Sequence, residues 1–203
     1  KHRCTYITSS IDTDRVIPNN RYSNEEKVRI GWTGTFSTRP FLDLLRPVFI
    51  ELKKQRDFKL IVIGNFDYDF PEMDLEVIQW SAEKEVEDLQ KLDIGVYPLP
   101  MDDWVLGKSG LKAIQYMSFG LPCVATDIST VQQFIEDGKN GVLVKTVDEW
   151  VFALSGLIDS PELRQKIGQS ARQTVLEKFS KHVVREQYLK VLESTVKTSG
   201  YGN

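Results

Sequence analysis

Short apolar runs alternate along the chain with segments whose apolar residues fall at helical spacing. Six of these runs are expected to be buried strands, and they span residues 28–32, 58–63, 75–80, 94–97, 122–126 and 142–145. Continuously apolar strands are typical of a parallel sheet that is covered on both faces. The alternation therefore predicts an α/β fold: a doubly wound, mainly parallel six-stranded sheet with helices on both faces.

Proline and capping residues indicate where the helices begin. We expect helices over residues 40–55 with a kink or restart at Pro47, over 83–92, from 109 onward, and over 131–136. Thr146 and Glu149 form a capping box for a helix that runs through residue 157. Ser160 and Pro161 begin another, whose expected core positions are Leu163, Ile167, Ala171, Val175 and Phe179.

The last helix is expected to begin at Ser180 and to leave some apolar side chains exposed. Its apolar stripe consists of Val183, Val184, Tyr188, Leu189 and Leu192. His182 has no visible partner in the sequence, and we expect it on the helix surface.

Composition and charge exclude several classes of protein. The chain has 203 residues and a formal net charge of −3, with acidic and basic residues interspersed, which argues against nucleic acid as the main partner. No apolar run approaches the ~20 residues that span a bilayer. Cys4 and Cys123 are too few and too far apart for a disulfide framework or a zinc cluster. No G-x-G-x-x-G or P-loop pattern follows a strand, so a dinucleotide-dependent oxidoreductase is not expected.

Residues 107–126, which read GKSGLKAIQYMSFGLPCVAT, carry the clearest chemistry. Lys108, Lys112 and Gln115 share one face of the expected helix, because they fall four and three residues apart. A helix N-terminus offers N–H donors and partial positive charge, and Gly107 and Gly110 allow a ligand to approach the backbone. Two lysines at that end predict an anion site, although the same loop, helix and strand also occur in α/β domains without one.

This stretch resembles the donor-nucleotide segment of family 4 (group 1) glycosyltransferases of the GT-B fold. The match follows the subgroup pattern G-K-x-x-x-K-x-x-Q-Y-M-x-x-G-x-P-x-V-A. The resemblance implies that Lys108 and Lys112 are catalytic and bind the diphosphate, together with Ser109, Gly110 and Leu111. It also implies that Gln115 holds the ribose. The broader family carries two glutamates where this chain has Gly107 and Gln115, so any sugar contact near Gly107 must come from the backbone or from a neighbour.

The turn after the first expected strand is a second phosphate-binding candidate. By the resemblance, Gly34 and Thr35 contact the diphosphate, and Arg39 and Trp104 are added as donor-loop contacts. The alternative is that Ser37 or Thr38 simply caps the helix that follows. Two Asp-x-Asp tripeptides, at residues 12–14 and 67–69, resemble the metal motif of other glycosyltransferases. Neither has a third ligand nearby in sequence, and we expect no metal and no cofactor.

The resemblance implies a donor-binding domain of a retaining, metal-independent glycosyltransferase that acts on a nucleoside-diphosphate sugar. Residues 1–24 would be a hinge or linker, 25–179 the donor nucleotide-sugar-binding domain, and 180–203 a crossing helix and tail. An absent N-terminal domain would bind a glycan or lipid-linked acceptor, so this chain alone should be inactive. The implied location is cytoplasmic, with peripheral contact to the inner membrane in a longer protein. Two alternatives stay open: a non-catalytic scaffold of the same fold, and a nucleotide-sugar epimerase.

Overall fold

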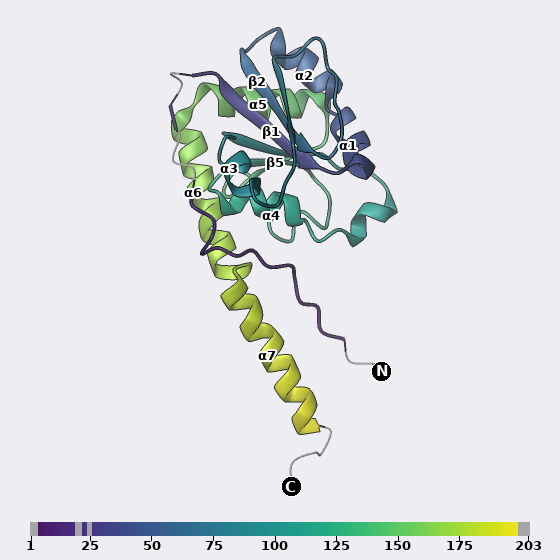
Figure 1. The fold of residues 1–203 in the computed structure, drawn as a ribbon, viewed down its shortest axis with the longest axis vertical. Helices are drawn as coiled ribbons and strands as arrows, with labels where there is room; N and C mark the ends of the chain where they lie inside the picture. The colour runs from purple at the N-terminus through teal and green to yellow at the C-terminus, as the bar shows by residue number, and fades with distance from the viewer. Residues whose placement is uncertain (1–3, 19–21, 24–25, 199–203) are drawn as a thin grey trace.

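The computed structural model describes residues 4–18, 22–23 and 26–198 and contains a six-stranded sheet (Figure 1). Its strands are β1 (Val28–Gly34), β2 (Phe58–Gly64), β3 (Leu75–Gln79), β4 (Ile94–Tyr97), β5 (Cys123–Thr126) and β6 (Val142–Val144). The spatial order is β3-β2-β1-β4-β5-β6, and every neighbouring pair is parallel. The predicted doubly wound fold is confirmed. The strand order reverses between β1 and β4, and ligands bind at the carboxyl edge of such switch points.

Helices cover both faces of this sheet. They are α1 (Arg39–Asp43), α2 (Arg46–Lys53), α3 (Glu85–Leu89), α4 (Leu111–Ser118), α5 (Val147–Asp159), α6 (Pro161–Lys178) and α7 (Lys181–Thr198), with short 3₁₀ turns η1 (Phe36–Thr38) and η2 (Asp103–Gly107). One buried cluster joins the sheet to α2 and α5, with Trp32, Phe49 and Leu154 near its centre. A second joins the opposite face to α3, α4 and α6. The sheet is therefore packed between two apolar layers, which fix the carboxyl ends of its strands relative to the helices.

The predicted helix over residues 131–136 is wrong. Residues 128–135 form successive turns instead, in which the Val131 N–H donates to the Ile128 carbonyl and the Phe134 N–H to the Val131 carbonyl. Buried Asn140 holds this path, because its side chain accepts from the Glu136 N–H at 2.7 Å and donates to the Phe134 carbonyl at 3.0 Å. A side chain that competes for backbone groups in this way favours turns over helix.

Leu163 is exposed, and the prediction that it lies in the core is wrong. The neighbouring Arg164 is buried instead, with 1% of its surface exposed. Its guanidinium donates to the Leu157 and Ile158 carbonyls at 2.6 and 3.0 Å. A cation thus completes the hydrogen bonding at the C-terminus of α5. Elsewhere the predicted signals hold: α2 restarts with Pro47 in its first turn, and Thr146 and Glu149 form the capping box of α5.

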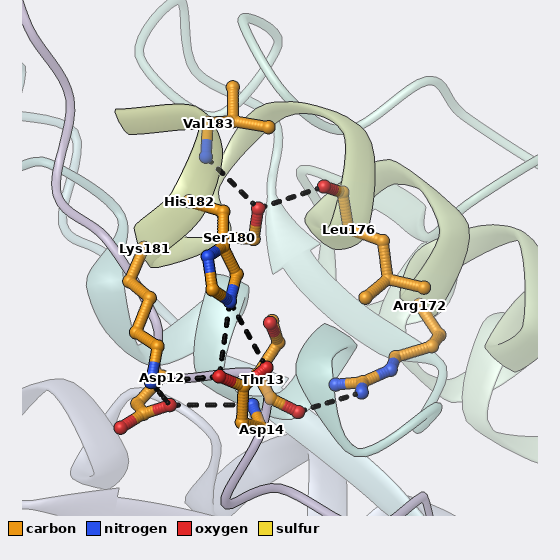
Figure 2. Close-up of polar contacts among 9 residues, drawn as sticks. All are labelled: Asp12, Thr13, Asp14, Arg172, Leu176, Ser180, Lys181, His182 and Val183. Carbon is orange, nitrogen blue, oxygen red and sulfur yellow. Dashed lines mark hydrogen bonds and ion pairs between the residues drawn. The ribbon is translucent and has the colours of Figure 1, made fainter. Parts of the chain in front are cut away.

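A polar cluster ties the N-terminal segment to the junction of α6 and α7 (Figure 2). We call it the clasp, and it consists of Asp12, Thr13, Asp14, Arg172, Lys181 and His182. Lys181 pairs with both aspartates at 2.8 Å, and the His182 ring lies 3.0 Å from the Asp14 carboxylate. The structure thus supplies a partner for His182 that the sequence did not reveal, and the side chain is 57% exposed on the helix surface, as expected. Arg172 donates to the Thr13 carbonyl and also to the Ser118 carbonyl at the end of α4.

Beyond the clasp, α7 extends away from the sheet (Figure 1). Val184 is buried, whereas Tyr188, Leu189 and Leu192 are 52%, 43% and 60% exposed. The prediction of a partly exposed apolar stripe is confirmed.

Replacing Lys181 with methionine should raise the pKa values of two aspartates in the clasp. Hydrogen bonds from Lys181 are the main reason that both the Asp12 and the Asp14 pKa lie below the usual 3.8, and His182 adds to the effect at Asp14. Because the folded-state values are depressed, the stability contributed by the clasp is present above the usual pKa and is lost as the pH falls through the lowered values. Carboxyl NMR titration should show both values moving toward 3.8 in Lys181→Met. Lys190→Met, on the same helix, should change neither, and an unchanged Asp12 in Lys181→Met would show that the ion pairs do not persist in solution.

Candidate functional site

The start of α4 lies at the carboxyl edge of the sheet and is built on a left-handed residue. Gly110 has φ +72° and precedes the first turn of α4. A Cβ added there would lie 2.4 Å from the Phe134 ring, so both the backbone angle and the space require glycine. At the other face of the helix, the buried Tyr116 hydroxyl accepts from the Thr33 N–H of β1 at 2.7 Å. The helix N-terminus is therefore fixed relative to the strand ends.

A cleft of about 310 Å³ opens at this N-terminus, and we call it the lysine cleft. Five of the predicted site residues lie together in its wall, namely Lys108, Ser109, Gly110, Leu111 and Lys112. Trp32, Thr38, Phe41, Tyr97 and Leu99 line the rest. The wall thus combines helix N–H donors, two cations and a hydroxyl.

Lys112 is largely withdrawn from solvent. Its ammonium lies 3.1 Å from the Thr38 hydroxyl and 5.0 Å from the centre of the Trp32 ring. Burial, and to a smaller extent the nearby cation Lys108, lower the pKa of Lys112 to about 8. No carboxylate among the described residues opposes this shift. A buried lysine beside a second cation is destabilised until an anion arrives, which favours an anion site.

Lys108 is held over aromatic rings. Its ammonium lies 4.1 Å from the centre of the Trp104 ring and 5.2 Å from that of Phe41. Partial burial lowers the pKa of Lys108, and the Asp102 carboxylate partly offsets this. Trp104 itself is 68% exposed, so it positions Lys108 from the rim of the lysine cleft.

Gln115 lies in a neighbouring cleft of about 320 Å³, which we call the Gln115 cleft. Leu111 lines both clefts, so they adjoin at the first turn of α4. The walls of the Gln115 cleft come from residues 10–16, α3 and α4, and they include the buried apolar side chains of Ile11, Leu89 and Phe119. The polar side chains of its lining are Ser10, Asp12, Arg15, Glu85 and Gln115.

Other predicted contacts lie outside the lysine cleft. Gly34 packs against the Trp32 ring, Thr35 bonds to Ser37, and the Arg39 guanidinium lies 3.8 Å from the Asp43 carboxylate. Thr38 is the residue of this turn that reaches the site. The alternative interpretation of the sequence was that Thr38 caps the helix that follows, and Thr38 does occupy the N-cap position of α1, but its side chain makes no cap hydrogen bond there. Its hydroxyl oxygen accepts from the Thr35 N–H at 3.0 Å instead, and it also meets Lys112.

In the first Asp-x-Asp tripeptide both aspartates have a structural role, because Asp12 and Asp14 belong to the clasp. In the second, the Tyr68 hydroxyl donates to Asp43 and the Asp69 backbone carbonyl accepts from Arg46. No group of three or more metal-ligating side chains occurs in the part of the chain that the structure describes. Among those same residues, no helix is both long and apolar enough to cross a membrane.

The all-parallel sheet, its switch point and the helices on both faces define a doubly wound, Rossmann-like α/β domain. The family of glycosyl transferases group 1 matches residues 27–160, which span the sheet and the lysine cleft. The chain belongs to this family.

Among its relatives is the N-acetyl-alpha-D-glucosaminyl L-malate synthase of Bacillus anthracis, which is 27% identical over 177 residues. That match covers 82% of this chain and 45% of the relative, so the chain spans less than half the relative's length. The C-terminal domain of a group 1 family protein (LpcC) from Francisella tularensis has a TM-score of 0.65 at 22% identity, covering 85% of this chain and all of that one. Anabaena HepE, solved with UDP and glucose, has a TM-score of 0.71 at 15% identity, covering 94% of this chain and 56% of that one. These likenesses confirm the fold that the resemblance implied.

Replacing Gly110 with alanine should destabilise the protein, whereas Gly107→Ala should not. A left-handed non-glycine residue costs about 1–3 kcal/mol, and the Phe134 ring would have to move as well. A Cβ at Gly107 would meet nothing within 4 Å, so that change should stay within about 0.5 kcal/mol. Urea unfolding of the two variants measures the difference. Equal stability of both would show that the turn before α4 is not held in this geometry.

Proposed function

We propose that this chain is the donor-binding domain of a retaining glycosyltransferase that uses a nucleoside-diphosphate sugar. The observation that carries the proposal is the pair of lysines at the N-terminus of α4, in a cleft whose described lining contains no carboxylate. A diphosphate supplies the negative charge that this arrangement lacks. HepE, a protein of the same fold, was solved with UDP and glucose, which supports a nucleotide in this region.

In this proposal the diphosphate occupies the lysine cleft and the nucleoside occupies the Gln115 cleft. The two clefts share Leu111, so one molecule can extend through both. The apolar floor formed by Ile11, Leu89 and Phe119 suits a flat base, and the Gln115 amide can bond to a ribose hydroxyl.

The lysines would act mainly on the leaving group. When the bond from the sugar's anomeric carbon to the phosphate oxygen breaks, the diphosphate keeps the electron pair and its negative charge grows. Lys108, Lys112 and the N–H groups of the first turn of α4 stabilise that charge from fixed positions, without a metal. An acceptor hydroxyl forms the new bond to the anomeric carbon, and its proton passes to an oxygen of the departing diphosphate. The acceptor, a glycan or a lipid-linked glycan, would be bound by a further domain, so this chain alone should not transfer sugar.

A scaffold role is the second candidate, and the exposed apolar side chains of α7 favour it. Tyr188, Leu189 and Leu192 could bind another chain without any donor. An epimerase would need an acid and a base at the reacting sugar, and the described lining of the lysine cleft holds no carboxylate or imidazole.

A nucleoside diphosphate should stabilise this chain against heat, and Lys112→Met should abolish the effect. Ligand at about 100 times its dissociation constant contributes about 2.7 kcal/mol, and the variant loses the buried cation while keeping an apolar stem. Thermal unfolding with UDP, GDP, TDP, CDP and ADP, with and without magnesium, measures this. Lys166→Met, on the exposed face of α6, is the control and should respond like the unmodified chain.

The outcomes separate the two candidates. A shift with one nucleotide that does not need magnesium supports a metal-independent donor site. No shift with any nucleotide, together with association that depends on protein concentration, would favour the scaffold instead. In an enzyme that includes the acceptor domain, loss of Lys112 should cost about 2–4 kcal/mol of transition-state stabilisation.

The affinity for UDP should fall as the pH rises through about 8. The Lys112 pKa is about 8 in the unoccupied chain, and a bound diphosphate raises it, so binding requires a proton at higher pH. Lys108 faces the same cleft and its pKa is also lowered, so it adds to the slope. Calorimetric titration between pH 7 and 9.5 should show roughly a tenfold loss per pH unit at most for each lysine.

Stability without nucleotide should change in the opposite direction. Between about 8 and the usual 10.5, the unfolded chain binds a proton that folded Lys112 releases, so folding becomes more favourable as the pH rises. Lys112→Met should lose the contribution of this lysine to the pH dependence of UDP affinity and to the pH dependence of stability. Equal slopes in the variant and the unmodified chain would show that Lys112 is not the titrating group.

A further inference from the structure

A third cleft adjoins the lysine cleft at the loop before α4. Its volume is about 310 Å³, and we call it the Glu177 cleft. It is lined by Tyr6, Thr8, Lys108, Ser109, Thr130, Gln133, Phe134, Glu177, Lys178, Phe179 and Gln187. Lys108 and Ser109 line the lysine cleft as well, so the two clefts meet at the loop before α4.

The lining of the Glu177 cleft suits a polyhydroxylated ligand. It brings hydroxyls, side-chain amides, one carboxylate and two lysines around three aromatic rings. The centres of two of these rings, Phe134 and Phe179, lie 6.1 Å apart. The Thr130 hydroxyl oxygen is buried in this wall and has no hydrogen-bond partner within the described part of the chain. An unsatisfied buried hydroxyl is costly in a finished core, but it is typical of a wall whose partner arrives with a ligand.

The three clefts follow one another around the N-terminal end of α4. The Gln115 cleft meets the lysine cleft at Leu111, and the lysine cleft meets the Glu177 cleft at Lys108 and Ser109. A nucleoside-diphosphate sugar has the same linear order, because its diphosphate joins the nucleoside to the sugar. With the diphosphate on the lysines and the nucleoside beside Gln115, the sugar can enter the Glu177 cleft where that cleft meets the lysine cleft, at Lys108 and Ser109.

We propose that the Glu177 cleft holds the sugar of the donor, and that the Glu177 carboxylate accepts hydrogen bonds from its hydroxyl groups. This inference rests on the proposed function. Glu177 is the one carboxylate among the residues that line this cleft and the lysine cleft. Gly107, in the loop before α4, has no side chain that could supply a carboxylate. The Asp102 carboxylate already accepts a hydrogen bond from the Val105 N–H at 3.2 Å.

Neighbouring residues hold Glu177 in place for this role. It lies in the last turn of α6, and the Gln173 amide, one turn earlier, donates to its Oε1 at 2.6 Å. That bond orients the carboxylate and leaves the acceptor capacity of a second oxygen toward the cleft. A carboxylate fixed at its base can discriminate sugars by the position of their hydroxyls, since a missing hydroxyl leaves its charge without a partner.

The carboxylate should affect the two parts of the donor in opposite ways. It repels a diphosphate at Lys108 and attracts sugar hydroxyls, so its removal should leave nucleotide binding intact or slightly tighter while weakening sugar binding. If Glu177 had only a structural role, its removal would weaken nucleotide binding and sugar binding together. The ratio of the dissociation constant for the nucleotide to that for its sugar conjugate therefore reports on the proposal.

The experiment is calorimetric titration of this chain with UDP, UDP-glucose and UDP-N-acetylglucosamine, and with GDP and GDP-mannose. Glu177→Gln and Glu177→Ala should lower the ratio about tenfold for the preferred sugar, the effect of losing a hydrogen bond to a charged group. Glu162→Gln makes the same change of charge at the far end of α6, about 22 Å away along the helix, and should leave the ratio unchanged.

Failure of the proposed function and failure of the sugar-site assignment give different results. If no nucleotide binds the unmodified chain, the proposed function falls and the sugar site falls with it. If UDP or GDP binds but the sugar adds no affinity, or if both Glu177 variants keep the ratio, the donor-binding function stands and the assignment of the Glu177 cleft is overturned. A lower ratio with unchanged UDP or GDP affinity supports it.

Discussion

The position of the α4 N-terminus depends on close packing at both faces of that helix. At its start, left-handed Gly110 lies so near Phe134 that no side chain fits. On its buried side, Tyr116 bonds to Thr33 of β1 and packs over Gly95 of β4, where a Cβ would come within 2.4 Å of its ring. These contacts bridge the two strands at the switch point. The packing of Gly110 and Tyr116 therefore determines where the helix N–H groups and both lysines lie.

The lysine cleft concentrates positive charge at the expense of stability. Burying Lys112 beside Lys108 disfavours its charged form, which is why its pKa is lowered to about 8. Hydrogen bonding to Thr38 and the faces of Trp32 and Trp104 compensate only in part. An anion that enters the cleft offsets this unfavourable electrostatic free energy. Part of the anion's binding free energy therefore comes from destabilisation that is already present in the folded chain. The rigid packing around α4 is what allows that arrangement to persist.

Much of the fold could be predicted from the sequence, because its strands are continuously apolar and several helix starts carry capping signals. The errors came where hydrogen bonds from a side chain to nearby backbone groups determine the local structure. Asn140 reaches back to Phe134 and Glu136 and replaces a helix by turns, and Arg164 is buried because the end of α5 needs donors. At the site, the run from Lys108 to Lys112 was visible as a local pattern, whereas Thr38 and Glu177 lie far from it in sequence and meet it only through the sheet topology. The prediction that Lys108 shares a helix face with Lys112 and Gln115 is wrong, because α4 begins only at Leu111 and Lys108 has extended backbone. Gln115 does lie on α4 with Lys112, yet it opens into a separate cleft, which residues 10–16 and α3 also line.

The clasp connects the walls of two clefts to the last helix. Residues 10–16 form one wall of the Gln115 cleft, and Tyr6 and Thr8 form part of the Glu177 cleft. Both stretches belong to the segment that Asp12, Asp14 and Arg172 tie to α6 and α7 (Figure 2). Arg172 also bonds to the end of α4, so the same side chain touches the helix that carries the lysines. A displacement of α7 would therefore shift the outer walls of both clefts while the lysines stay fixed on the sheet, which makes the width of the site depend on how the two ends of the chain are held.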